Sequence, residues 1–359
     1  MFRIHRLLPA AATSRRHIHQ QQSVLEAIQE VREHLSRVSS FSAARNDAKV
    51  LVANALQPPL ASSNDVFFHS ERKLTGHEAA VLTSSMGRYS EGEPLAYVTG
   101  RKEFWSLEFK VTRDTLIPRS DSEVLIETLV DQFHPETPLR VLDIGTGSGC
   151  LLLSALSEFP RATGVGIDIC PGALAVAKQN AQSNNLDGRA NFLLGDLKTL
   201  SGLRSDVAEG ETLYRRFDVI LCNPPYIPSR ELDLVGPDVL KYEPHLALFA
   251  GGGLTVDDSE LDPEGLRMYR LLHRSVDKLF KRESGDARRA SAKDGKLGKN
   301  CLLMEIGSED QARAVQKLFS SRTKSGDPQM EGNKNSQLQF DRFLFDASGK
   351  YRGLLFLAP

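Results

Sequence analysis

The sequence predicts an α/β fold: a mostly parallel sheet of seven strands flanked by helices, preceded by a small helical domain. Two observations support this class. Between residues 139 and 357 short apolar runs alternate with helix-like segments, and between residues 24 and 88 apolar residues recur at three- and four-residue spacing. Strands that alternate with helices form parallel sheets, because each crossover helix returns the chain to the same edge. With 359 residues, 40% of them apolar, the chain can bury one large core and one small one.

The predicted strands of the sheet are seven apolar runs. They cover residues 139–144, 163–169, 190–194, 217–222, 300–306, 339–346 and 354–357. Helices are expected at residues 150–158, 266–280 and 311–319, and residues 230–244 have the composition of an acidic loop. Three stretches rich in Gly, Ser and charge, at residues 201–216, 281–299 and 320–336, are predicted to be inserted surface loops.

Composition weighs against several classes of function. Basic and acidic residues nearly balance, 45 against 46, whereas a protein that grips DNA by itself carries a basic excess or a basic face. No apolar run approaches the ~20 residues of a membrane span. The four cysteines stand singly, without a Cys-x-x-Cys pair, so we expect small buried thiols in a reducing compartment and no metal site.

The first residues differ from the rest of the chain. Residues 1–25 contain four arginines and three histidines, and the first acid is Glu26. A basic, acid-free start without a long apolar core is typical of a mitochondrial transit peptide. We therefore predict a transit peptide over residues 1–22 and a location in the mitochondrial matrix. The alternative is a disordered basic tail.

The helical pattern continues over residues 23–92, which we predict to form a small bundle. Residues 93–118 are expected to be a hairpin connector, with residues 96–99 and 104–111 extended, and residues 119–359 the catalytic domain. Phe104 and Trp105 either belong to the core or wall a ligand crevice. The first helix of the catalytic domain is expected to follow Arg119, with Ser120 or Asp121 as its cap.

A glycine-rich loop follows the first predicted strand of the sheet. The loop is Gly145-Thr146-Gly147-Ser148-Gly149, and a helix-like segment comes directly after it. Strand, glycine loop and helix in this order form a nucleotide cradle, because backbone can approach the ligand and the helix start offers free N–H groups. Asp168 lies 168 − 145 = 23 residues after the first glycine, where a carboxylate binds the two ribose hydroxyls. The third glycine comes one position earlier than in the dinucleotide fingerprint, which favours a mononucleoside such as S-adenosylmethionine over NAD.

Polar residues also end the next two predicted strands. Asp196 follows the run at residues 190–194 and could accept the adenine amino group, and Asn223 follows the run at residues 217–222. Because the carboxyl ends of parallel strands share one edge of a sheet, these side chains and the glycine loop are expected to line a single crevice.

The tetrapeptide Asn223-Pro224-Pro225-Tyr226 presents acceptors without competing backbone donors, since proline has no N–H. The Asn223 side-chain oxygen and the Pro224 carbonyl can each accept one N–H of a planar NH2 group, while the Tyr226 ring lies against its face. Such a nitrogen is a weak nucleophile, so holding and aiming it is most of the catalytic task. The alternative is an ordinary turn, because Asn-Pro and Pro-Pro are common in loops.

Together these motifs resemble the HemK-type methyltransferases, which modify a glutamine of peptide chain release factors. The resemblance extends from about Glu93 to the C-terminus. Besides the glycine loop and the tetrapeptide it rests on residues 103–109, 116–119, 242–248, 265–270 and 303–307. It implies a class I S-adenosylmethionine-dependent methyltransferase fold, Rossmann-like, with a final reversed strand.

By this resemblance the cofactor is S-adenosyl-L-methionine and the partner a class I release factor containing Gly-Gly-Gln, whose glutamine becomes N5-methylglutamine. The N-terminal bundle recognises the release factor, and the chain is expected to be a monomer without direct nucleic-acid or membrane contacts. Glu243 shapes the glutamine slot. Leu197 stands beside the adenine where family members often have an aromatic residue, so adenine packing is expected to differ here.

Two alternatives stay open at the level of sequence. An adenine-N6 methyltransferase of DNA or RNA shares the Asn-Pro-Pro-Tyr motif, because it must clamp a similar planar amine. A cofactor-binding assembly factor without turnover would keep the fold but not need the complete set of Gly145, Asp168 and Asn223.

Overall fold

The computed structural model describes residues 18, 21–37, 41–198, 204–205, 211–213, 215–250, 262, 264–281, 298–320 and 338–358. The chain divides into two compact units, Met1–Thr99 and Gly100–Pro359. Almost all of the predicted transit peptide, and most of the three predicted insertions, lie outside the described residues. No described helix is both long enough and apolar enough to span a membrane.

The first unit is the predicted helical bundle. Capping boxes start two of its helices: Ser23 pairs with Glu26, and Thr75 with Glu78. Its core is formed by the apolar positions that recur at helical spacing in the sequence, and these side chains are almost fully buried. The helices are α1 (Val24–Leu35), α2 (Phe41–Ala55), the 3-10 helix η1 (Ser63–His69), α3 (Gly76–Ser90) and α4 (Leu95–Thr99).

The prediction that residues 96–99 are extended is wrong, because they form helix α4. Pro94 precedes the helix and its carbonyl accepts the N–H groups of Tyr97 and Val98. The Arg88 guanidinium binds the Tyr97 and Val98 carbonyls at the other end, and Gly100 then leaves the helix with φ +73°. These caps outweigh the strand preference of the sequence.

The second unit contains the sheet, which has the strand order β10-β11-β9-β8-β3-β4-β5. Five strands are parallel, and β11 runs antiparallel to both β9 and β10, which confirms the predicted reversed strand. The strands are β3 (Arg140–Ile144), β4 (Thr163–Asp168), β5 (Ala190–Leu194), β8 (Val219–Cys222), β9 (Cys301–Glu305), β10 (Gln339–Phe345) and β11 (Tyr351–Leu357). Two small antiparallel sheets accompany this seven-stranded sheet. Strands β1 (Arg101–Phe104) and β2 (Leu107–Lys110) form a hairpin that precedes it in the sequence. Strands β6 (Arg204–Ser205) and β7 (Glu211–Thr212) form the other.

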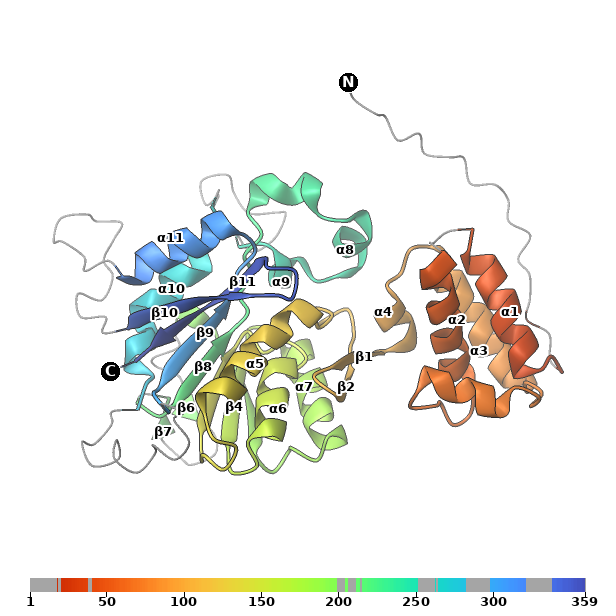
Figure 1. The fold of residues 1–359 in the computed structure, drawn as a ribbon, viewed down its shortest axis with the longest axis horizontal. Helices are drawn as coiled ribbons and strands as arrows, with labels where there is room; N and C mark the ends of the chain where they lie inside the picture. The colour runs from red at the N-terminus through yellow and green to blue at the C-terminus, as the bar shows by residue number, and fades with distance from the viewer. Residues whose placement is uncertain are drawn as a thin grey trace, which may run out of the picture. The chain divides into compact units, whose positions relative to one another are not determined.

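Helices cover both faces of the sheet (Figure 1). On one face α5 (Glu123–Gln132), α6 (Cys150–Glu158) and α7 (Pro171–Ser183) bury an apolar cluster. On the other, α10 (Arg267–Ser275) and α11 (Glu309–Ser320) bury a second. Phe104 of the hairpin is buried in the first cluster and Trp105 packs against it, so both have the core role and the hairpin belongs to this unit.

Three local predictions need correction. The residues proposed to cap the first helix form the 3-10 helix η2 (Ser120–Ser122), and none of their side chains caps α5. The expected loop at residues 230–244 contains η4 (Ser229–Leu234) and α8 (Pro237–Tyr242), because Pro237 presets the first helical position. Helix α10 ends at Ser275 and continues only as the 3-10 helix η6 (Val276–Lys278). A short helix α9 (His245–Leu248) follows α8.

Candidate active site at the carboxyl edge of the sheet

The structure brings the glycine loop and the tetrapeptide together. Ile144, at the end of β3, pairs with Ile167 of β4 on one side and with Cys222 of β8 on the other. A Cβ atom added to Gly145 would lie 3.6 Å from the Asn223 backbone oxygen. The predicted crevice residues of these three strands therefore meet at one edge.

The glycine loop needs its glycines for backbone conformation. Gly145, Gly147 and Gly149 all have positive φ, at +75°, +54° and +83°, which L side chains rarely adopt. A Cβ on Gly147 would meet no atom within 4 Å, so the loop borders open space there. Ser148 is buried, and its carbonyl accepts a hydrogen bond from Asn180 at 2.8 Å.

Two carboxylates fix this loop. The Gly147 N–H donates to Asp168 Oδ2 at 2.8 Å, and Thr146 Oγ1 donates to Asp143 Oδ2 at 2.6 Å. Burial raises the pKa of Asp143 to about 7, although the hydrogen bond from Thr146 lowers it. Burial also raises the pKa of Asp168, whose backbone hydrogen bonds oppose the shift. Asp143 Oδ1 is buried, and no described residue donates a well-formed hydrogen bond to it.

These residues fit a nucleoside. Asp168 is only partly buried and keeps acceptor capacity for ribose hydroxyls beyond its backbone donors, which include Gly147 and Cys170. Asp196 is partly exposed after β5, where the Gly195 N–H binds the Asp168 carbonyl at 3.0 Å. Leu197, in contrast, is buried in the core cluster beneath α10 and α11. The described residues contain no group of three or more side chains that could hold a metal ion.

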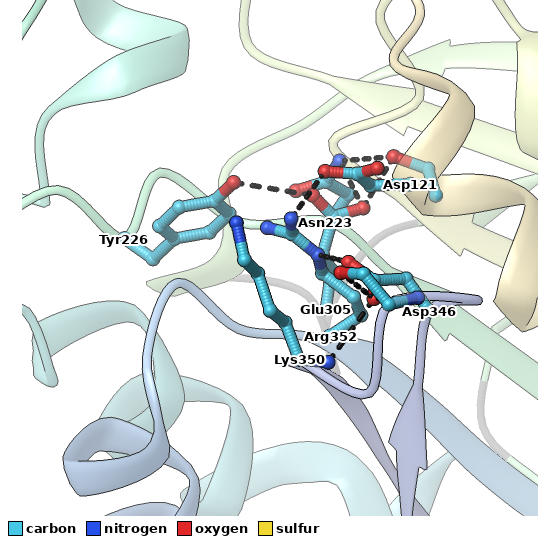
Figure 2. Close-up of polar contacts among 9 residues, drawn as sticks. Asp121, Asn223, Tyr226, Glu305, Asp346, Lys350 and Arg352 are labelled. Atoms are coloured by element: carbon cyan, nitrogen blue, oxygen red, sulfur yellow. Dashed lines mark hydrogen bonds and ion pairs between the residues drawn. The ribbon is translucent and has the colours of Figure 1, made fainter.

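Asn223 is held by a buried carboxylate that the sequence analysis did not single out (Figure 2). Its Nδ2 donates to Glu305 Oε2 at 2.8 Å, with Ser122 Oγ 3.4 Å away. Ser122 Oγ donates to the same carboxylate oxygen at 2.5 Å, and the Tyr226 hydroxyl donates to Oε1 at 3.2 Å. Within the described residues nothing donates to the Asn223 side-chain oxygen or to the Pro224 carbonyl.

Glu305 is 3% exposed, and burial raises its pKa to about 7. The hydrogen bonds from Ser122 and Tyr226 and the charge of Arg352 act in the opposite direction, while the charge of Asp121 adds to the increase. Arg352 itself bridges Asp121 Oδ2 and Asp346 Oδ2, both at 2.8 Å. This ion-pair network lies beside Glu305 in Figure 2.

A cavity of about 690 Å³ opens beside Asn223 and Tyr226. Tyr226 is held in its wall from two sides: its ring packs on Gly307, and its carbonyl accepts from Gln311 Nε2 at 3.0 Å. The glycine loop does not line this cavity. The remaining lining comes mostly from η4, α8, α9 and the start of α11, and includes Leu116, Ile227, Pro228, Glu231, Leu234, Val239, Leu248 and Ala314.

Glu243 acts on this cavity through a neighbour. It is 4% exposed, and its carboxylate accepts from the Ile117 N–H at 3.2 Å and from Arg119 at 2.5 Å. Arg119 lines the cavity and Glu243 does not. Pro224 is buried and Pro225 partly exposed, and neither lines the cavity.

Comparison with known proteins agrees with this geometry. The sequence matches a methyltransferase domain over residues 136–313 and a PrmC N-terminal domain over residues 26–100. It is 36% identical over 248 residues to the release factor glutamine methyltransferase of Caulobacter vibrioides, covering 69% of this chain and 72% of that protein. The chain belongs to the release factor glutamine methyltransferase family.

Other members of the family show similar agreement. The release factor glutamine methyltransferase of Rhodospirillum rubrum is 34% identical over 244 residues, covering 68% of this chain and 67% of that protein. That of Agrobacterium fabrum is 31% identical over 280 residues, covering 77% and 82%. Membership confirms the predicted resemblance, the methyltransferase fold and S-adenosylmethionine as methyl donor.

Proposed function

We propose that this chain transfers a methyl group from S-adenosylmethionine to the side-chain amide nitrogen of the glutamine in the Gly-Gly-Gln motif of a peptide chain release factor. Family membership supports the substrate class. The observation that carries the proposal is a pair of oxygens, on Asn223 and Pro224, to which no described residue donates. A primary amide has two N–H groups to give to such a pair.

The chain's own residues bind and aim the nitrogen. Asn223 Oδ1 and the Pro224 carbonyl each accept one N–H, which fixes the plane of the substrate amide. When bound, the cofactor supplies an electrophilic methyl carbon on a positively charged sulfur. The sulfur of the bound cofactor would keep the bonding electrons as the methyl group passes to the substrate nitrogen, and that nitrogen becomes more acidic. Both acceptors then bind its hydrogens more strongly than before, so they favour the transition state.

One proton must leave the methylated nitrogen. Water or the two acceptor oxygens can take it, because an N-methylated amide cation is strongly acidic. Glu305 is not placed for this task, since its oxygens already accept from Asn223, Ser122 and Tyr226. No dedicated general base is therefore required.

Several finer features belong to the same proposal. The N-terminal helical unit, which matches the PrmC N-terminal domain, recognises the release factor. The basic start of the sequence supports the mitochondrial matrix as the location, and a monomer suffices because the proposed site is built from one chain. The balanced net charge supports a protein substrate over nucleic acid.

The test is mass spectrometry of candidate acceptors incubated with the protein and S-adenosylmethionine. An organellar release factor, duplex DNA and single-stranded RNA are compared under the same conditions. We expect one added methyl group on the glutamine of Gly-Gly-Gln and none on nucleic acid. Methylation of adenine with an unmodified release factor would instead establish the adenine-N6 alternative.

A further inference from the structure

The orientation of the Asn223 amide determines whether it can act as a clamp. A side-chain amide presents an acceptor oxygen on one side and a donor NH2 on the other. Only the oxygen can accept an N–H from a substrate amide. If the group were turned over, two donors would face each other and the substrate would be repelled.

Glu305 decides between the two orientations. When ionised, the Glu305 carboxylate can only accept hydrogen bonds, so it attracts the Asn223 NH2 and repels its oxygen. The observed contact, 2.8 Å from Nδ2 to Oε2, has the NH2 on the Glu305 side, which leaves the oxygen on the opposite side of the amide. Because Glu305 is 3% exposed, no bulk water is present to compensate a reversed contact.

The surrounding residues keep Glu305 in this role. The Ser122 and Tyr226 hydroxyls also donate to it, so three donors converge on the two oxygens. Arg352 supplies positive charge nearby while remaining bound to two other acids. The arrangement is therefore a preorganised acceptor and not a chance contact.

We propose that Glu305 is a positioning residue: its carboxylate holds the Asn223 amide with the oxygen turned toward the substrate nitrogen. This inference rests on the proposed function, because it assigns a role within the same amide clamp. Glu305 touches no substrate in this account and acts only through Asn223. Its removal should affect turnover and leave cofactor binding unchanged.

The decisive experiment is a double-mutant cycle with Glu305→Leu and Asn223→Ala. Leucine has a similar size and cannot accept a hydrogen bond. In the wild-type background we expect Glu305→Leu to lower kcat roughly tenfold to a hundredfold, as removal of an orienting residue does, with an unchanged Kd for S-adenosylmethionine. In the Asn223→Ala background the same substitution should change kcat by less than about twofold, because nothing remains to be oriented.

Tyr269→Phe is the matched control. It removes a hydrogen bond at the same residue, from the backbone of Glu305, and leaves the Asn223 contact intact. Its kcat should stay close to that of the wild type even where its thermal stability falls. The assignment would be overturned if Glu305→Leu lowered kcat equally in both backgrounds. It would also be overturned if Tyr269→Phe lowered kcat as much as Glu305→Leu does.

A second measurement needs neither a Glu305 variant nor turnover. In the wild-type protein, NMR can follow hydrogen exchange of the Asn223 side-chain NH2, assigned by the signals that disappear in Asn223→Ala. We expect at least one of its protons to exchange roughly tenfold or more slowly than those of the exposed Asn191, as a hydrogen-bonded group does. Equally fast exchange at both residues would show that Glu305 does not hold the amide. If the wild type fails to methylate the release factor, only the proposed function fails, and the exchange result still judges the orientation.

Discussion

Replacing Glu305 by Gln should make folding stability less dependent on pH. Burial raises the pKa of Glu305 from 4.5 to about 7 in the folded protein. The folded state therefore binds the proton more tightly than the unfolded chain. The resulting stabilisation is fully present below pH 4.5 and is lost as the pH rises through 7. Glutamine is neutral throughout and shows no such change.

The magnitude follows from the two pKa values. A shift of one pKa unit corresponds to about 1.4 kcal/mol, so between pH 5 and pH 8 the wild type should lose about 2 to 3 kcal/mol relative to Glu305→Gln. For a unit of this size that is a difference of roughly 5–10 °C in Tm. Glutamine can keep the hydrogen bonds, since its oxygen can accept from Asn223 and Ser122 while its NH2 donates to the Tyr226 hydroxyl.

The assay is thermal and urea unfolding of both proteins at pH 5 and pH 8. Asp143, whose pKa is also raised to about 7, is present in both and cancels in the comparison. We expect the variant to be the more stable protein at pH 8 and to match the wild type near pH 5. Parallel changes in the two proteins would mean that Glu305 does not carry a raised pKa.

Two further substitutions test the cofactor and substrate sides of the site. Asp168→Asn removes an anionic acceptor and sets an NH2 against the N–H of Gly147 or Cys170. The Kd for S-adenosylmethionine, measured by calorimetry, should therefore rise about tenfold or more. An unchanged Kd would exclude Asp168 from the cofactor site. Glu243→Gln weakens the ion pair that holds Arg119 in the cavity wall. The KM for a Gly-Gly-Gln peptide should therefore rise roughly threefold to tenfold, with a smaller change in kcat. A loss in kcat with an unchanged KM would contradict this prediction.

The sequence was sufficient for the fold and for the residues at strand ends. Asp168 and Asn223 each lie at the end of a short apolar run, and parallel pairing brings such ends together regardless of the rest of the chain. Glu305 also ends an apolar run, so the same rule could have identified it. Its contact with Asn223, 82 residues away in sequence, depends on the pairing of β8 with β9, which only the structure provides.

The errors have a similar origin. Asp121 is one of the two residues predicted to cap the first helix of the catalytic domain, but its carboxylate pairs with Arg352, which lies 352 − 121 = 231 residues away in sequence. The composition of residues 96–99 favours a strand, but hydrogen bonds with Pro94 and Arg88 at the two ends of the segment stabilise a helix. In each case a specific contact outweighs a local preference that sequence alone can weigh only on average.

The most direct test of the amide clamp compares the kcat of the wild type with that of Asn223→Ala. The substrate is a release factor containing Gly-Gly-Gln, S-adenosylmethionine is saturating, and methylation of the glutamine is measured by mass spectrometry. Loss of a preorganised acceptor should lower kcat about a hundredfold or more, while the Kd for the cofactor changes less than about threefold. A variant that binds the cofactor normally and methylates at the wild-type rate would show that Asn223 does not clamp the substrate amide.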